Sequence, residues 1–222
     1  MICLLQVLLL FTLSVSIQAL DKCPENIQTV DTLDVQKYFG YWYDTYGTDS
    51  RITTEGNRCI RANYKSFSKY LSTNKVKSKS EKTLELKSLI FLDETFISVR
   101  NVAIKVGNTD FTEICGYGYQ IHPYTDPGKL EVGFPSGSTP GIYCILGTDY
   151  DNYACTYSCS EFNGSANVFA SVLTRDPFPT FETVEKCLDI FITNGVDIAD
   201  FVTFSQEDCY YGFIDSISCD EQ

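Results

Sequence analysis

The stretch DVQKYFGYWY, residues 34–43, is the most informative part of this 222-residue chain. It places Gly40 two residues before Trp42, which is the only tryptophan. Two further short signatures follow at long distances: Thr148-Asp149-Tyr150, and Arg175 at the end of an apolar run. The assignment of a fold rests on the order of these three signatures and on the segments between them.

Those segments are rich in β-branched and aromatic residues and are separated by Gly, Pro, Asn and Asp. Short segments of this kind are typical of an all-β barrel or sandwich. The predicted strands cover residues 41–48, 58–68, 95–106, 111–122, 129–134, 142–149, 153–161 and 167–175, with a short strand at 201–204.

One helix is expected after the last long strand. The segment 176–180 contains two prolines, which stop the strand. From Thr180 to Asn194, apolar residues recur at intervals of three and four, at positions 184, 187, 188 and 191, and Asn194-Gly195 ends the pattern. This single apolar stripe predicts a helix that lies against the outside of the barrel.

Successive side chains of a strand point to opposite faces, so alternation assigns an inner face. A tight hairpin at residues 148–150 puts Cys144 on the same outer face as Cys155, Tyr157 and Cys159, and Glu131 also points outward. Many of the inward residues are small or hydroxylic, which predicts an interior with space for a ligand. The residues assigned to the interior are Ile60, Ala62, Tyr64, Leu130, Val132, Phe134, Ala154, Thr156 and Ser158, with Gly116 and Gly118.

The first twenty residues, MICLLQVLLLFTLSVSIQAL, carry no charged side chain and predict a secretory signal peptide cleaved near Ala19 or Leu20. No second apolar stretch is long enough to span a bilayer, so we expect a secreted, extracellular protein. The formal net charge of -12 argues against nucleic acid and anionic membranes as partners. The lysine-rich segment 65–87 is the exception, and it predicts a solvated hairpin in preference to a docking surface.

Ten cysteines are present, and nine remain once Cys3 is removed with the signal peptide. So many in a secreted chain predict disulfide bonds, with at least one thiol left over or paired between molecules. No Cys-x-x-Cys occurs, so no metal site is expected. The sequon Asn163-Gly164-Ser165 predicts a glycosylation site at Asn163.

The three signatures resemble those of the lipocalin family. In that family the Gly-x-Trp begins the first strand, the Thr-Asp-Tyr closes a late hairpin, and the arginine stacks on the tryptophan at the barrel floor, at about 0.5–2 kcal/mol. The resemblance implies an all-β fold: an eight-stranded antiparallel up-and-down calycin barrel with one C-terminal α-helix packed outside. It also turns Arg175 inward, so that Phe169, Ser171 and Leu173 face the interior.

Within the family, residues 34–43, 57–64, 148–154 and 157–159 look like apolipoprotein D and its relatives. The similarity covers about residues 23–209 and departs at 70–94, an inserted or extended hairpin loop. That loop lies at the closed end of a lipocalin, so the insertion is expected to spare the mouth. The implied division is a signal peptide at 1–20, a lipocalin domain at 21–210 and an acidic C-terminal tail at 211–222.

The resemblance also implies disulfide pairs. Family members join the equivalents of Cys23–Cys159 and Cys59–Cys209, each at about 2–4 kcal/mol. A Cys155–Cys187 pair resembles the staple between helix and barrel in crustacyanin subunits, the carotenoid-binding lipocalins of crustaceans. Cys115, Cys144 and Cys219 are left without an assigned partner, and an intermolecular disulfide through Cys219 is one hypothesis.

The function implied is a secreted carrier of a small hydrophobic ligand: a lipid such as a fatty acid, a sterol, a retinoid, a bilin or a carotenoid. No other cofactor is expected. One alternative is a crustacyanin-like pigment protein that binds a carotenoid, and another is an extracellular protein-interaction module that forms a homo- or heterodimer. The candidate cavity-wall residues are Tyr46, Tyr64, Val132, Phe134, Tyr143, Phe169 and Ser171.

Catalysis is not expected. His122 is the only histidine and lies at a strand end, and Ser136 is not in a Gly-x-Ser-x-Gly elbow. An isomerase of this family would need a thiol inside the barrel, whereas alternation places Cys115 and Cys144 outside.

Overall fold

The computed structural model describes residues 22–49, 56–66, 96–134, 139–162, 164–212, 215 and 219. The predicted signal peptide, the sequon residue Asn163, Ser136, the insertion at 70–94 and all of the lysine-rich segment beyond Ser66 lie outside these residues.

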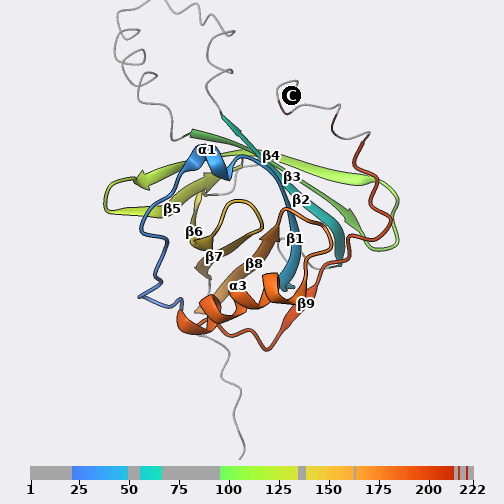
Figure 1. Ribbon diagram of the computed structural model, residues 1–222. Helices are drawn as coiled ribbons and strands as arrows, with labels where there is room; N and C mark the ends of the chain where they lie inside the picture. Colours follow the sequence, from blue (N-terminus) through green and yellow to red (C-terminus); the bar gives the residue numbers. More distant parts are fainter. Residues whose placement is uncertain are drawn as a thin grey trace, which may run out of the picture.

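The strands form one antiparallel sheet that closes on itself (Figure 1). The first eight run up and down in chain order, and β1 pairs with both β8 and β2, which closes the barrel. A short ninth strand pairs with the upper part of β1. The predicted up-and-down barrel is therefore confirmed. The strands are β1 (Gly40–Thr48), β2 (Asn57–Ser66), β3 (Phe96–Lys105), β4 (Phe111–His122), β5 (Asp126–Gly133), β6 (Gly141–Thr148), β7 (Tyr153–Phe162), β8 (Ser165–Thr174) and β9 (Phe201–Thr203).

Helix α3 (Phe181–Thr193) lies outside the barrel across β6 and β7, as the apolar stripe predicts. The side chain of Thr180 caps its start by accepting the backbone N–H of Thr183. A second helix, α1 (Val35–Tyr38), is one turn long and was not predicted, because one turn is too short to show a period. Its N-cap is Asp34.

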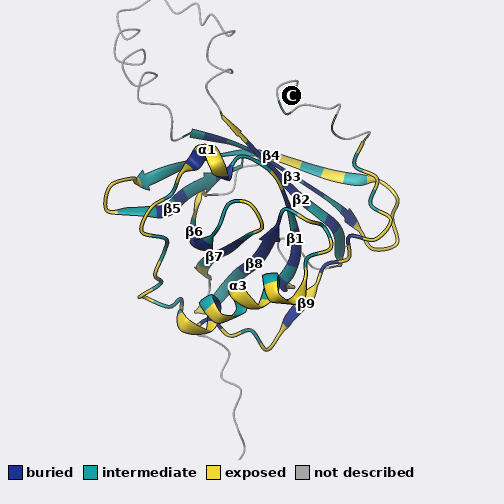
Figure 2. Cartoon of the chain, in the orientation of Figure 1, coloured by how far each residue is buried: buried dark blue, intermediate teal, exposed yellow. Residues whose placement is uncertain are grey.

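Buried apolar side chains form two clusters on opposite sides of the barrel wall. Figure 2 shows buried residues, in dark blue, along the barrel strands, whereas much of α3 is exposed. The floor cluster lies inside the barrel where α1 meets it, and the outer cluster lies between the wall and α3. The floor cluster contains Val35, Tyr38, Trp42, Ala62, Tyr64, Ile97, Val99, Leu130, Ile145, Ala154 and Leu173. The outer cluster contains Cys144, Leu146, Cys155, Tyr157, Ala170, Val172, Cys187, Phe191, Val196 and Phe201.

The structure contains the three disulfides that the resemblance implied, Cys23–Cys159, Cys59–Cys209 and Cys155–Cys187. A fourth joins Cys115 to Cys219, so the hypothesis of an intermolecular disulfide through Cys219 is wrong. Among the described cysteines, Cys144 alone is free, and it is buried.

The path of the C-terminal segment explains the fourth disulfide. After β9 the chain crosses the outside of β2, where the Tyr211 ring packs 5.5 Å from Phe111 and 4.0 Å from the Arg61 guanidinium. The carboxylate of Asp215 pairs with the same arginine. These contacts lead the tail to Cys115 on β4.

Candidate functional site: a cavity above the barrel floor

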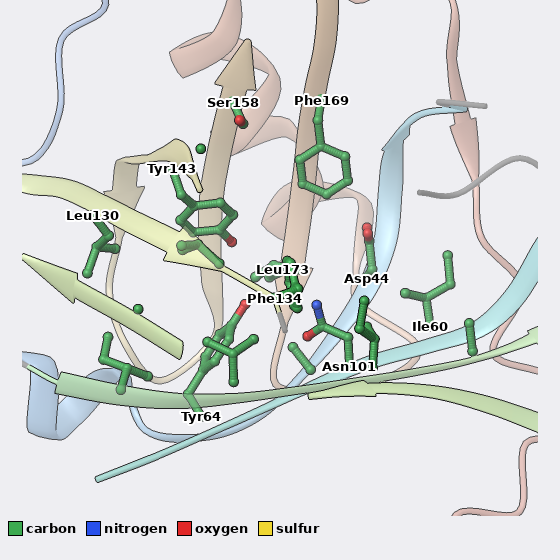
Figure 3. Close-up of a pocket in the computed structure, with 18 of the residues that line it drawn as sticks. Asp44, Ile60, Tyr64, Asn101, Leu130, Phe134, Tyr143, Ser158, Phe169 and Leu173 are labelled. Atoms are coloured by element: carbon green, nitrogen blue, oxygen red, sulfur yellow. The ribbon is translucent and has the colours of Figure 1, made fainter. Parts of the chain in front are cut away.

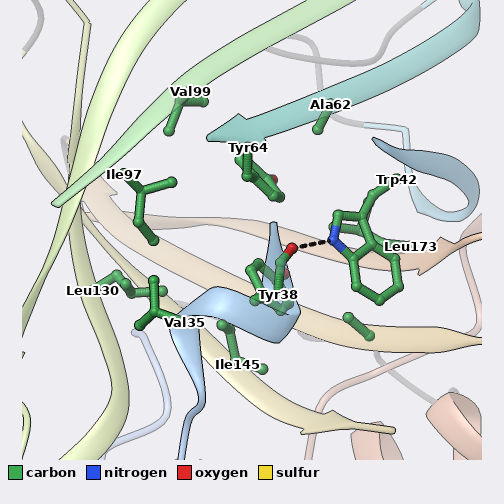
Figure 4. Packing of buried hydrophobic residues seen from close by; sticks show 11 residues of the cluster. Val35, Tyr38, Trp42, Ala62, Tyr64, Ile97, Val99, Leu130, Ile145 and Leu173 are labelled. Carbon is green, nitrogen blue, oxygen red and sulfur yellow. Dashed lines mark hydrogen bonds between the residues drawn. The ribbon is translucent and has the colours of Figure 1, made fainter. Parts of the chain in front are cut away.

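The floor of the barrel is built around Trp42, which is fully buried. Its indole N–H donates to the Tyr38 carbonyl over 2.8 Å (Figure 4). The Arg175 guanidinium lies 3.6 Å from the centre of the indole ring, as the resemblance implied. Gly40 has a φ of +102°, and a Cβ there would lie 3.2 Å from a guanidinium nitrogen of Arg175. Both facts favour glycine at the first position of the Gly-x-Trp signature.

Arg175 also satisfies the backbone around the floor. Its guanidinium donates to the carbonyls of Tyr150, Tyr41, Lys37 and Phe39 at 2.7–3.0 Å. Hydrogen bonds from a charged donor are the strong ones. One side chain thus ties α1, β1 and the turn after β6 together and closes this end of the barrel.

The Thr148-Asp149-Tyr150 turn positions the Tyr150 carbonyl, which accepts a hydrogen bond from Arg175. The Asp149 carboxylate accepts the backbone N–H groups of Asn152 and Tyr153 at 2.8 and 3.0 Å. The Thr148 hydroxyl accepts the N–H of Tyr150 and donates to the Tyr153 carbonyl. The turn holds Tyr150 at a φ of 67°, and the Tyr150 carbonyl points to Arg175.

The described strands on either side of residues 67–95, β2 and β3, meet at this closed end. Gly40 at the floor pairs with Tyr64, and Ser66 pairs with Ile97 two residues further along. The chain therefore leaves and re-enters the barrel near the floor. That the insertion itself spares the mouth stays a prediction, because its residues lie outside the described part.

Above the floor the barrel encloses a cavity of about 620 Å³ (Figure 3). Its wall is mainly apolar and includes five of the seven predicted wall residues. Ser171, also predicted, is buried and hydrogen-bonds to a wall residue, Asp44. The predicted residues that line the cavity are Tyr64, Val132, Phe134, Tyr143 and Phe169, together with the inward residues Ile60, Ala62, Gly118, Leu130, Ser158 and Leu173.

Tyr46, the seventh predicted wall residue, does not line the cavity. The pairing of β1 with β8 shifts by one residue between Asp44 and Tyr46, a β-bulge that reverses the alternation. Tyr46 therefore points outward and packs against the outer cluster, with its ring 5.8 Å from that of Phe201. Placing Tyr46 in the cavity wall was wrong.

The two glycines of β4 help to keep the interior open. A Cβ on Gly116 would lie 2.5 Å from the Phe134 ring. Because glycine has no side chain, the Phe134 ring can pack directly against β4 at this position. Gly118 lines the cavity directly.

Two polar side chains in the cavity, Asp44 and Asn101, were missed by the sequence reasoning. Both are on its wall, on β1 and β3. The Asp44 side chain accepts a hydrogen bond from the Ser171 hydroxyl. Burial raises the pKa of the Asp44 carboxyl to about 7, although the Ser171 hydrogen bond opposes that shift. Alternation from the inward Trp42 could have placed Asp44 inside, because the bulge comes after it.

Three tyrosine hydroxyls also lie low in the barrel, on Tyr38, Tyr64 and Tyr143. Burial raises the pKa of each hydroxyl well above its ordinary value. They remain neutral at physiological pH and can both donate and accept hydrogen bonds.

The groups considered for catalysis lie elsewhere. His122 is exposed at the end of β4, Cys115 is in a disulfide, and Cys144 belongs to the outer cluster. Glu113 lies near Cys115 and Cys219, but both sulfurs are in their disulfide and offer no thiolate to a metal. In the described part of the chain, no helix has the length and apolar character needed to cross a membrane.

An up-and-down barrel that is closed by an arginine on a tryptophan and hollow above them defines the calycin class of β-barrels. Among known protein families, the sequence model of the "Lipocalin / cytosolic fatty-acid binding protein family" matches residues 71–208 of this chain. The chain belongs to the lipocalin family.

Curated relatives extend over most of the chain. Apolipoprotein D of Mus musculus is 31% identical over 191 residues, which cover 86% of this chain and 85% of that protein. The Crustacyanin-A1 subunit of Homarus gammarus is 39% identical over 92 residues, 40% of this chain and 50% of the subunit. Among solved structures, lobster apocrustacyanin A1 shares the fold with a TM-score of 0.60 at 24% identity, covering 82% of this chain and 85% of that chain.

Proposed function

We propose that this protein is a secreted carrier that binds a small hydrophobic molecule in its barrel cavity. The observation that carries the proposal is the cavity of about 620 Å³ with a mainly apolar wall. Pockets for small molecules usually measure about 300–1,000 Å³. Family membership supports the same function, and the predicted signal peptide and the disulfides support secretion.

The binding energy available from such a wall is sufficient. Removing ~300 Å² of ligand surface from water at ~25 cal/mol/Å² gives on the order of 7 kcal/mol before the cost of association. Micromolar or tighter binding needs no chemistry beyond shape and a few polar contacts.

The test is a titration with N-phenyl-1-naphthylamine, a neutral apolar dye whose fluorescence rises on entering a dry pocket. Gly118→Leu places an apolar side chain in the cavity, where a Cβ would meet Val132 at an ordinary 3.4 Å. We expect it to weaken dye binding about tenfold or more, by occupying the space. Thr203→Leu adds similar bulk at an exposed position on β9 and serves as the control. Failure of the dye to bind, or equal binding by Gly118→Leu, would contradict the proposal.

A second candidate is a pigment protein of the crustacyanin type. It is favoured by the Cys155–Cys187 staple and by the 39% identity to the crustacyanin subunit. The Cys155–Cys187 disulfide stabilises the fold but does not set which ligand the pocket accepts. Only the identity of the bound ligand therefore distinguishes the pigment protein from the lipid carrier. An absorption spectrum and mass spectrum of an organic extract, taken on protein from its natural source, separate the two. A visible band with a carotenoid would support the pigment protein, and a colourless lipid or sterol would support a lipid carrier.

A further inference from the structure

The polar groups in the cavity wall have fewer hydrogen bonds than they can make. Ser171 is the one hydrogen-bond partner of the Asp44 carboxyl among the residues that the structure describes. The Asn101 side-chain oxygen is buried and has no partner in that part of the chain. The Asp44 carboxyl and the Asn101 amide both project into the space enclosed by the strands (Figure 3). A buried polar group without a partner is costly, so each is a place where a ligand can add a hydrogen bond.

Asp44 lies low in the cavity. It is two residues above Trp42 on β1, and the alignment of β1, β2 and β3 puts Asn101 beside Ala62, which itself pairs with Trp42. A ligand that reaches these groups must enter with its polar end first and leave its apolar part toward the mouth.

Among the wall residues that the structure describes, no cation balances Asp44 inside the cavity. Arg61 is the one basic residue among the described wall residues. Its guanidinium lies outside the barrel between the rings of Tyr41 and Tyr211, at 4.2 and 4.0 Å, and pairs with Asp215. A ligand carboxylate beside Asp44 would therefore be buried next to a like charge without compensation, which is strongly unfavourable.

The other polar groups near the floor do not decide between ligands. The hydroxyls of Tyr38, Tyr64 and Tyr143 are neutral and can donate to a carboxylate or accept from an alcohol equally well. The Asn101 amide likewise offers both a donor and an acceptor. Among the described wall residues, Asp44 alone places a carboxyl charge at this depth of the cavity, because the other acid, Glu113, pairs with Arg100.

We propose that the cavity selects apolar ligands whose polar end donates a hydrogen bond and carries no negative charge, an alcohol or an amine, and rejects the corresponding carboxylate. The donor reaches the Asp44 carboxyl near the floor. This inference rests on the proposed carrier function and narrows its ligand class.

The test compares three ligands with one apolar chain: dodecanol, dodecylamine and dodecanoate, each displacing N-phenyl-1-naphthylamine. It is done at about pH 8.5, where Asp44 is ionised and the amine is still protonated. We expect dodecanoate to bind at least about tenfold more weakly than either dodecanol or dodecylamine. A tenfold difference in affinity is about 1.4 kcal/mol, which one modest repulsion between charges can supply. Dodecanoate binding as tightly as dodecanol would overturn the inference.

Asp44→Asn removes the charge, keeps the size and keeps an oxygen to accept from Ser171. We expect it to tighten dodecanoate and weaken dodecylamine by about tenfold each, while dodecanol changes by less than about threefold. Asp189→Asn, the same change at an exposed position on α3 that does not line the cavity, is the control and should leave the order of the three ligands unchanged. A shift of acid and amine in the same direction would contradict a role of the Asp44 charge. Should the variant fail to fold, the order in the unaltered protein still decides.

The dye separates this inference from the proposed function. If the dye binds and the acid displaces it as well as the alcohol does, or if none of the three ligands displaces it, the carrier function stands and the selectivity is wrong. If neither the dye nor any ligand enters the cavity, the carrier function fails as well.

Discussion

The wall formed by β6, β7 and β8 has two faces of different character. On the outer face, Cys155, Tyr157 and Val172 are buried beneath α3 in a filled apolar cluster held by a disulfide. On the inner face, the neighbouring Thr156, Ser158 and Ser171 are small and hydroxylic, and the space in front of the wall is open. One set of strands thus places most of its packing on one side and its room for a ligand on the other. Changes on the outer face should lower stability and leave binding intact. Changes inside the barrel should alter binding, and they should alter stability mainly where they remove the buried charge of Asp44.

Phe191→Ala breaks the outer face and should have the largest effect. The ring is fully buried in α3 and meets Phe201 at 5.4 Å. Its loss should lower the free energy of unfolding by about 4 kcal/mol, from lost transfer energy and a residual cavity. Urea unfolding followed by Trp42 fluorescence measures it. Ile192→Ala, at the exposed neighbouring position, is the control and should change stability by less than about 0.5 kcal/mol. Weaker dye binding by folded Phe191→Ala would show that the two faces are coupled.

Asp44→Asn should raise stability at high pH, because it removes the buried charge of the inner face. Burial raises the pKa of this carboxyl from 3.8 to about 7, with Ser171 and Tyr64 beside it. A raised pKa in the folded state leaves stability intact below the unfolded pKa, and stability falls as pH rises through the folded value. The loss in the unaltered protein should develop between about pH 4 and 7 and amount to up to about 4 kcal/mol.

The measurement is the free energy of unfolding of both proteins at intervals across that range. The gain from Asp44→Asn should grow with pH and level off above the folded pKa. Asp189→Asn on the exposed side of α3 is the control. A gain that is the same at both ends of the range would contradict the burial of an ionised Asp44.

Replacing Cys155 and Cys187 together by Ala removes the staple of the outer face. The two residues are 32 apart in the chain, and the loss should be about 2–3 kcal/mol, mainly through a less restricted unfolded state. Dye affinity of the folded variant should stay within about twofold, since neither residue lines the cavity. A larger loss of affinity would mean that α3 helps to shape the interior.

Sequence patterns were reliable where the strands are regular. Alternation placed Tyr64, Val132, Phe169 and Ser158 on the cavity wall, because each lies in an uninterrupted stretch of its strand. The stacking of Arg175 on Trp42 at the floor was also predictable, through the resemblance of the three signatures to those of the lipocalin family. Alternation cannot detect a bulge, and the bulge between Asp44 and Tyr46 reversed the assignment of Tyr46.

Other features depend on tertiary contacts that no local pattern records. The pairing of Cys115 with Cys219 follows from the path of the tail across Arg61. The buried Asp44 was overlooked because alternation was used to find apolar wall residues and a carboxyl is rarely buried without a cation. Ligand-binding roles for the wall residues stay predictions.

The smallest effects expected come from a pair of aromatic residues on opposite faces. Phe169→Leu trims the inner face, and we expect a loss of dye affinity of about threefold with a stability change under about 1 kcal/mol. Tyr46→Leu trims the outer face, and we expect about 1 kcal/mol of lost stability from its contact with Phe201, with unchanged affinity. The two variants isolate the bulge: without it, Tyr46 would point inward like Trp42 and Asp44. A loss of affinity in Tyr46→Leu would therefore place its ring in the cavity and contradict the register of β1 and β8, on which the outward position of Tyr46 depends.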